Sequence, residues 1–171
     1  MTHLNVEIKA RTDRAEQIRQ ILEAQNARFI GIDHQIDTYF VVPSGRLKLR
    51  QGNIETTLIH YARPDQAGPK TSTVSLYHPK TDGALKHVLQ AALDTLVIVD
   101  KHRAIYFIDN VKFHVDVVEG LGHFVEIEAI DTDGTIGLER LQEQCDHYIG
   151  LLGIRKEDLI ERSYSDLLME Q

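Results

Sequence analysis

Residues 111–130 of the chain read VKFHVDVVEGLGHFVEIEAI, and this stretch carries the clearest structural signal in the sequence. On both sides of Gly120-Leu121-Gly122, apolar and ionic residues alternate one by one, which is the period of a β-strand. The stretch therefore predicts two strands, at about Val111–Glu119 and Phe124–Ile130, joined by a turn. One face of this hairpin is apolar. The other face carries Lys112, His114, Asp116, Glu126 and Glu128.

The same alternation extends outward from this hairpin to six further segments, with helical patterns between some of them. Strands are predicted at about Leu4–Arg11, Ile36–Val42, Arg46–Gln51, Glu55–Arg63, Leu96–Ile108 and, more weakly, Thr71–His78. Helices are predicted from Asp13 to about Asn26, from Asp82-Gly83 onward, from Leu138 to Leu152, and over about Lys156–Met169. Consecutive, hairpin-like strands with inserted helices favour an α+β fold built on an antiparallel sheet that closes, or nearly closes, into a barrel.

The bulk properties of the chain favour one cytoplasmic domain. A length of 171 residues allows one hydrophobic core, so we expect a single domain over residues 1–171. The N-terminal dozen residues are charged, and no run approaches the ~20 apolar residues of a membrane span, so neither a secretory signal nor a membrane span is expected. A lone cysteine, Cys145, excludes an internal disulfide framework and is typical of a reducing compartment.

The charges of the chain favour a small anionic ligand. A net charge of −7 argues against broad binding to nucleic acid, which needs a basic surface. The 19 Lys and Arg residues are nevertheless concentrated locally. Arg46, Lys48 and Arg50 alternate along one predicted strand, and Lys101 and Arg103 repeat this spacing. Local basic strands in an acidic protein suit a compact anion better than a polymer.

The alternation has two interpretations. A half-exposed sheet would turn its apolar face inward and its ionic face to solvent, which is common. Alternatively, the apolar stripes of the inserted helices cover the strands from outside, and the ionic faces line the barrel interior. The second interpretation is favoured because cations gather on the middle strands and carboxylates on the first and last ones. Such an interior could hold Mg²⁺, which prefers oxygen ligands, beside Arg and Lys side chains that neutralise a triphosphate.

Six short segments occur in a fixed order along the chain. They are Val6-Glu7-Ile8-Lys9, Asp37-Thr38-Tyr39-Phe40, Leu47-Lys48-Leu49-Arg50, Lys101-His102-Arg103, the run from Val115 to Glu128, and Ser163-Tyr164-Ser165-Asp166-Leu167-Leu168. Together they resemble the CYTH superfamily of triphosphate tunnel metalloenzymes, in its class IV adenylate cyclase-like and thiamine triphosphatase-like group. The resemblance covers nearly the whole chain. It implies a closed eight-stranded antiparallel β-barrel with flanking helices, dependence on Mg²⁺ or Mn²⁺, and a triphosphate substrate.

The resemblance also implies roles for individual residues. The metal carboxylates would be Glu7, Asp116, Glu126 and Glu128. The phosphate path would be lined by Lys9, Arg46, Lys48, Arg50, Arg63, Lys101 and Arg103, of which Lys9, Lys101 and Arg103 are expected to be catalytic. The chain departs from the family signature Glu-x-Glu-x-Lys at Asn5, whose neutral oxygen can still coordinate a cation. The Thr71–Tyr77 segment also lacks charged residues often found there.

The sequence alone is compatible with several functions. An enzyme of this kind would hydrolyse tripolyphosphate or an organic triphosphate such as thiamine triphosphate, or would cyclise ATP to cyclic AMP. Because Asn5 removes one negative charge, a non-catalytic barrel that binds polyphosphate or another phosphorylated ligand is the alternative. A plain sheet without a site is the third. The resemblance is compatible with a homodimer, and neither nucleic acid nor a membrane is an expected partner.

Overall fold

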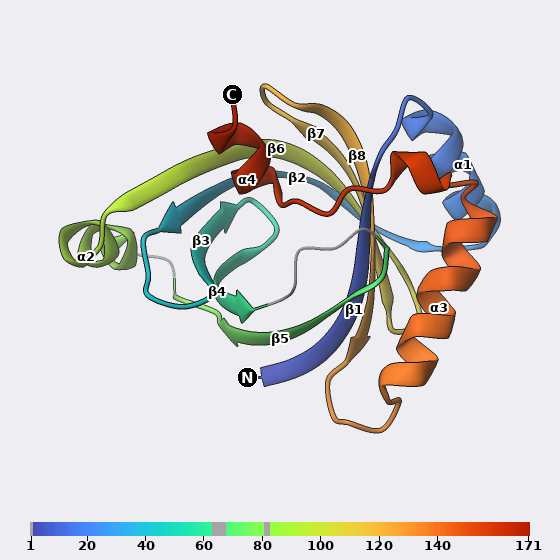
Figure 1. The fold of residues 1–171 in the computed structure, drawn as a ribbon, viewed down its shortest axis with the longest axis horizontal. Helices are drawn as coiled ribbons and strands as arrows, with labels where there is room; N and C mark the ends of the chain where they lie inside the picture. The colour runs from blue at the N-terminus through green and yellow to red at the C-terminus, as the bar shows by residue number, and fades with distance from the viewer. Residues whose placement is uncertain (1, 63–67, 81–82) are drawn as a thin grey trace.

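The computed structural model describes residues 2–62, 68–80 and 83–171, and in them eight strands form one closed antiparallel barrel (Figure 1). Around the barrel the strands follow the order β1-β5-β4-β3-β2-β6-β7-β8. Their bounds are β1 (Thr2–Arg11), β2 (Arg28–Phe40), β3 (Arg46–Gly52), β4 (Thr56–Ala62), β5 (Lys70–Tyr77), β6 (Thr95–Ile108), β7 (Val111–Val118) and β8 (Gly122–Asp131). The predicted closed eight-stranded antiparallel barrel is confirmed.

Strand β2 is longer than the sequence pattern predicts. It begins at Arg28 rather than at about Ile36. The pairing of β2 with β6 shifts register between Phe29 and Gly31, which marks a β-bulge or similar irregularity. An extra residue at such a point interrupts the alternation by which a strand is recognised. For this reason the sequence pattern did not predict the early part of β2 as a strand.

Two helices lie on the outside of the barrel, and their apolar stripes cover it as expected. Helix α1 (Ala15–Ala24) contacts β7 and β8, and α3 (Leu138–Leu151) contacts β1 and β8 (Figure 1). The largest core cluster forms at this contact between strands and helices. It includes Val6, Ile8, Ala10, Ile18, Leu22, Val125, Ile127, Leu141 and Cys145. The apolar faces of β1, β7 and β8 are buried there, and the ionic faces of the strands line the barrel interior, so the half-exposed sheet is excluded.

Helix α2 (Ala84–Ala92) joins β5 to β6 and contains no buried residue. The predicted helix start at Asp82 lies outside the described residues. No helix in the described parts of the chain has both the length and the apolar character needed to cross a membrane.

The prediction of one helix over Lys156–Met169 was wrong. The segment contains a short 3₁₀ turn, η1 (Lys156–Asp158), and a separate helix, α4 (Tyr164–Met169). Between them the chain is extended and pairs with β1, where the Ile160 backbone N–H donates to the Lys9 carbonyl at 2.9 Å. Ser163 then starts a new helix, because its hydroxyl accepts a hydrogen bond from the Asp166 backbone N–H.

Helix α4 and the segment before it fill one end of the barrel. The segment crosses β1, and α4 packs against β6 (Figure 1). Apolar side chains from the strands and from this C-terminal segment form a second cluster there. Its buried members are Tyr39, Val99, Val118, Phe124 and Tyr164. The C-terminal segment therefore limits access to the barrel interior from this end.

Candidate functional site

The barrel encloses a cavity lined by inward-facing residues of its strands, by Glu55 and His78 next to strand ends, and by Ser163 and Tyr164 of the C-terminal segment. Its lining is rich in ionic side chains that alternate with outward-facing apolar ones. The ionic lining residues are Glu7, Lys9, Lys48, Arg50, Glu55, Lys101, Arg103, Lys112, Glu126 and Glu128. Cations and carboxylates are thus mixed inside one partly enclosed space, where electrostatic interactions are stronger than in water.

A buried carboxylate, Asp37 on β2, organises the cations of the neighbouring strands. Arg50 donates from Nε and Nη2 to its two oxygens at 2.9 and 2.8 Å, and Lys101 Nζ donates to Oδ2 at 2.7 Å. Lys48 Nζ lies 3.2 Å from the same oxygen. Burial alone would raise the pKa of Asp37, but Arg50, Lys101 and Lys48 hold that pKa well below its usual value. Asp37 is therefore ionised, and three basic side chains converge on it, although burial outweighs Asp37 and holds the pKa of Lys101 well below its usual value.

Arg103 on β6 is held by a second group of buried residues. Its guanidinium donates to both oxygens of Asp116 at 2.8 and 2.7 Å, and to Glu126 Oε1 at 2.9 Å. The Tyr164 hydroxyl donates to Asp116 Oδ2 at 2.7 Å. Asp116 has no exposed surface and does not line the cavity in the described part of the chain. Its contacts fix the position of Arg103, which does line the cavity.

The carboxylates gather where β1 meets β8. Glu7 pairs with Glu128 in the strand register, and Lys9 pairs with Glu126, so these side chains share the inner face. Asn5 Nδ2 donates to Glu128 Oε1 at 2.6 Å. The Asn5 Oδ1 atom is buried and has no hydrogen-bond partner in the described structure.

These residues offer a partial site for a divalent cation. Within the described residues, no three His, Cys, Asp or Glu side chains are placed to hold a metal ion together, and Glu126 is engaged with Arg103. The donor chemistry nevertheless fits a hard cation, since Glu7, Glu128 and the unpartnered Asn5 Oδ1 are all oxygen donors. Mg²⁺ usually takes one or two carboxylates and completes its shell with water and substrate phosphates. The residues therefore fit a cation whose coordination the substrate completes.

Lys9 lies between the carboxylates and the C-terminal segment. Its Nζ atom is 3.9 Å from the centre of the Tyr164 ring. Burial lowers the pKa of Lys9, while the nearby Glu126 carboxylate counteracts this effect. Burial also raises the pKa of Glu126, but Lys9 and Arg103 outweigh it and hold that pKa well below its usual value. Each of these groups therefore affects the charge state of the others.

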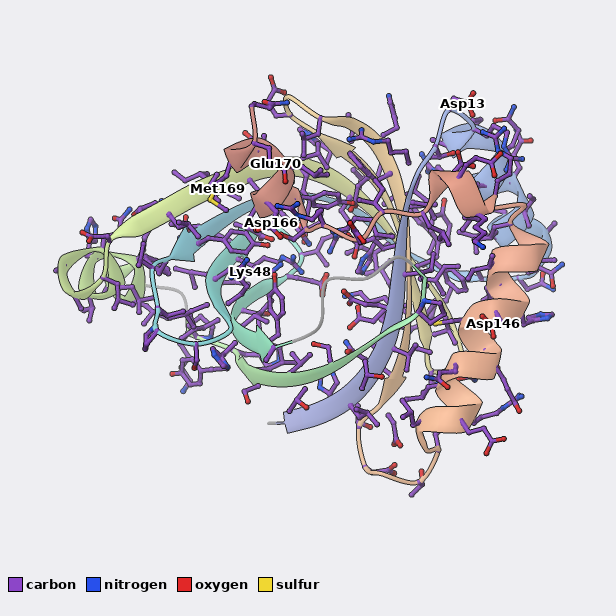
Figure 2. The ribbon with its side chains drawn as sticks, viewed as in Figure 1. Asp13, Lys48, Asp146, Asp166, Met169 and Glu170 are labelled. Atoms are coloured by element: carbon purple, nitrogen blue, oxygen red, sulfur yellow. The ribbon has the colours of Figure 1, made fainter. Side chains whose placement is uncertain are left out.

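Most of the residues predicted for the site line this cavity, but Arg46 and Asp116 do not. Arg46 pairs with Asp166 of α4 at 3.1 Å, its side chain is 40% exposed, and it is absent from the described lining. Asp116 lies behind Arg103, and Arg63 lies outside the described residues. Figure 2 shows Lys48 inside the ring of strands and Asp166 on α4, whereas Asp146 lies on α3 outside the barrel.

The structure adds an ion pair that the sequence analysis did not select for the site. Lys112 Nζ lies 2.6 Å from Glu55 Oε2. Glu55 follows a turn that Asp33 holds by accepting hydrogen bonds from the Ile54 and Glu55 backbone N–H groups at 2.8 and 2.9 Å. Lys112 shares a strand face with His114, so alternation could have identified it. Nothing in the sequence around Glu55 shows that its turn is fixed in this way.

The chain also resembles known proteins. A family model described as the CYTH domain matches residues 3–164. A search of curated proteins finds no match.

Several solved structures have the same fold. The PH1012 protein of Pyrococcus horikoshii is 26% identical, with a TM-score of 0.78 over 95% of this chain and 98% of that one. A proposed adenylate cyclase of Vibrio parahaemolyticus is 19% identical, with a TM-score of 0.78 over 97% and 98%. A proposed adenylyl cyclase of Hippeastrum, reported to have a dominant triphosphatase activity, is 16% identical, with a TM-score of 0.63 over 98% and 94%.

Proposed function

Because the chain belongs to the CYTH domain family, we propose that it is an enzyme that acts on a small triphosphate with Mg²⁺ or Mn²⁺. One observation carries this proposal. Inside a single closed barrel, cations organised by buried carboxylates lie in the same cavity as a set of oxygen donors that fits a divalent cation. Two proteins with this fold support a triphosphate as the substrate: the proposed adenylate cyclase of Vibrio parahaemolyticus, and the proposed adenylyl cyclase of Hippeastrum with its dominant triphosphatase activity.

The phosphates would bind along the cation-rich strands. Lys48, Arg50 and Lys101 already converge on Asp37, so their side chains lose little further freedom when an anion binds beside them. Arg and Lys form charge-assisted hydrogen bonds with phosphate oxygens, and Arg can do so with two bonds at once. In this proposal Asp37 keeps the cations in place and reduces their mutual repulsion before the substrate arrives.

The catalytic roles follow from the positions of three cations. Lys9, Lys101 and Arg103 line the cavity and would stabilise the charge that develops on the transferred phosphoryl group. We propose that Asp116 positions Arg103 instead of binding the cation, because both of its oxygens are already engaged. Arg46, which is partly exposed and paired with Asp166, remains a candidate only for the edge of the phosphate path, and Arg63 remains a prediction from the sequence.

The divalent cation would be held by Glu7 and Glu128, with Asn5 Oδ1 and, once released from Arg103, Glu126. When bound, such a cation neutralises phosphate oxygens and makes the phosphorus more susceptible to attack. Asn5 makes this set less negative than one with four carboxylates would be. Its amide also holds Glu128 Oε1 at 2.6 Å, which orients that carboxylate before any cation binds.

Two reactions are compatible with these residues. If water attacks the terminal phosphorus, the enzyme is a triphosphatase. If a ribose 3′-hydroxyl attacks the α-phosphorus of ATP, the products are cyclic AMP and pyrophosphate. The same cations would serve both reactions, because phosphoryl transfer depends mainly on positioning and on charge stabilisation.

The test is a panel of tripolyphosphate, thiamine triphosphate and ATP, each with Mg²⁺ and with Mn²⁺, with the products separated by chromatography. Glu126→Gln is the test variant, and Glu119→Gln, an exposed carboxylate on the same hairpin, is its matched control. We expect metal-dependent turnover that Glu126→Gln abolishes and Glu119→Gln retains. If folded wild-type protein turns over none of these substrates, the enzyme proposal is refuted, and a non-catalytic binding barrel becomes the better interpretation.

A further inference from the structure

Among the side chains that the structure describes, those that β4 and β5 turn toward the cavity form a neutral wall. These residues are Thr57, Ile59, Tyr61, Ser72, Val74 and Leu76. None of them is charged, whereas β1, β3, β6, β7 and β8 each contribute at least one ionic side chain to the lining. Ile59, Tyr61 and Val74 are 7–9% exposed and pack together, with Leu76 against them. The wall therefore offers mainly apolar contacts.

This neutral wall lies across the cavity from cationic strands. In the closed order of eight strands, β5 is four places from β6, and β4 is four places from β7. Strands half a turn apart in a barrel face each other across its interior. The neutral wall therefore faces the side that carries Lys101, Arg103 and Lys112. A ligand that fills the cavity meets cations on one side and apolar side chains on the other.

Polar atoms of His3, Thr57 and His78 lie at the edge of the neutral wall. His3 pairs with Val74 in the β1–β5 register, and its Nδ1 atom is buried without a hydrogen-bond partner in the described part of the structure. Thr57 Oγ1 lies 3.3 Å from Nδ1 of His78, and both residues line the cavity. An imidazole nitrogen and a hydroxyl can bond with the neutral donors and acceptors of an organic group.

The two walls discriminate between kinds of triphosphate. Tripolyphosphate carries charge along its whole length, and charged oxygens placed against Ile59 and Val74 would lose their hydration without compensation. An uncharged organic group would gain from the same burial. We propose, on the basis of the proposed function, that the substrate is an organic triphosphate ester. Its uncharged organic group lies against Ile59, Val74 and Leu76, while its phosphates face β6 and β7.

The test compares kcat/KM for ATP and for tripolyphosphate, measured with the same metal in wild type and in two variants, Val74→Lys and Leu76→Lys. Wild type is expected to prefer ATP. Each new lysine is expected to shift the ratio toward tripolyphosphate by about tenfold or more, since a contact in an apolar pocket is worth roughly that factor in discrimination. Leu76 is only partly buried, so its variant is the one better able to fold.

Ile98→Lys is the matched control. Ile98 is 49% exposed on the outer face of β6, so the new lysine adds the same charge outside the cavity. It should leave the ratio unchanged. The inference is overturned if wild type prefers tripolyphosphate. It is also overturned if Val74→Lys and Leu76→Lys shift the ratio of the two kcat/KM values no further than Ile98→Lys does. Calorimetric titration of ATP and tripolyphosphate with Mg²⁺ applies the same criteria to affinity. The inference is thus tested even if no substrate is turned over, a result that would refute the proposed function alone.

Discussion

Asp37→Asn is the substitution with the most informative expected effect on stability. The change keeps the shape of the side chain but removes the charge on which Arg50, Lys101 and Lys48 converge. Asp37 and Lys101 are each 1% exposed, and Arg50 is 7% exposed, so water cannot replace the lost carboxylate. Removing one partner of a buried ion pair typically costs about 3–5 kcal/mol, because it leaves uncompensated charge behind.

The loss can be measured by urea denaturation followed by circular dichroism. For a domain of this size, a loss of about 3–5 kcal/mol corresponds to a fall in Tm of roughly 6–20 °C. We also expect tripolyphosphate to raise the Tm of Asp37→Asn more than that of wild type, since an anion can neutralise the three cations in place of Asp37. The control is Asp100→Asn, whose 46% exposed carboxylate pairs with His34, and its cost should stay below about 1 kcal/mol.

A loss of less than about 1 kcal/mol in Asp37→Asn, which is the range of exposed ion pairs, would refute the role of Asp37 in holding these basic side chains. Equal stabilisation of wild type and variant by tripolyphosphate would refute that role as well. Either result would mean that the cations around Asp37 are better solvated, or less dependent on its charge, than their contacts indicate.

Three further predictions concern stability and reactivity. Burial raises the pKa of Glu55, but Lys112 and Arg50 outweigh it and lower that pKa from 4.5 to about 2. Glu55→Gln should therefore cost about 1–3 kcal/mol above pH 5, and the difference should shrink as the pH falls toward 2. In Gly52→Ala, the new Cβ would lie 2.6 Å from the Asp33 carboxylate, so urea denaturation should show a loss of about 1–3 kcal/mol. Burial raises the pKa of Cys145 to about 12, so iodoacetamide should label it at pH 8 only after unfolding.

Each of these predictions has a clear contrary result. A cost of Glu55→Gln that is constant from pH 7 to pH 3 would show that Lys112 does not control the charge of this carboxylate. A stable Gly52→Ala variant would mean that the turn held by Asp33 can move without loss. Rapid labelling of Cys145 in native protein would show that the packing of α3 opens readily.

The fold was predictable because its evidence is local. Alternation along each strand shows which side chains share a face, and the apolar stripes of the helices show which face they cover. The pattern places Glu7, Lys48 and Glu126 on the ionic faces of their strands, and the segregation of charges among the strands favoured turning those faces inward. The early part of β2 was not predictable, because a register shift near Gly31 interrupts the alternation there. The break between η1 and α4 was missed because it depends on pairing with β1, far away in the sequence.

The partners of the site residues were not predictable, because they depend on which strands become neighbours. Parity places Asp37 and Asp116 inside the barrel, but it does not show that the first gathers cations from β3 and β6. Nor does it show that the second is engaged with Arg103 and Tyr164. The neutral wall is a similar case. Ile59 and Val74 were visible in the sequence, but their position opposite the cations depends on the closed strand order.

The placement of β1 has a consequence for how the chain is synthesised. This first strand is hydrogen-bonded on one side to β5 and on the other to β8, where Leu4 pairs with Asp131. A ribosome makes β1 before either partner, and β8 emerges only after all the other strands of the barrel. Until then β1 has an open edge that can pair with other nascent chains, and contacts so distant in sequence form slowly. Barrel closure is therefore a late event, and a chaperone that shields β1 during synthesis should increase the yield of folded protein.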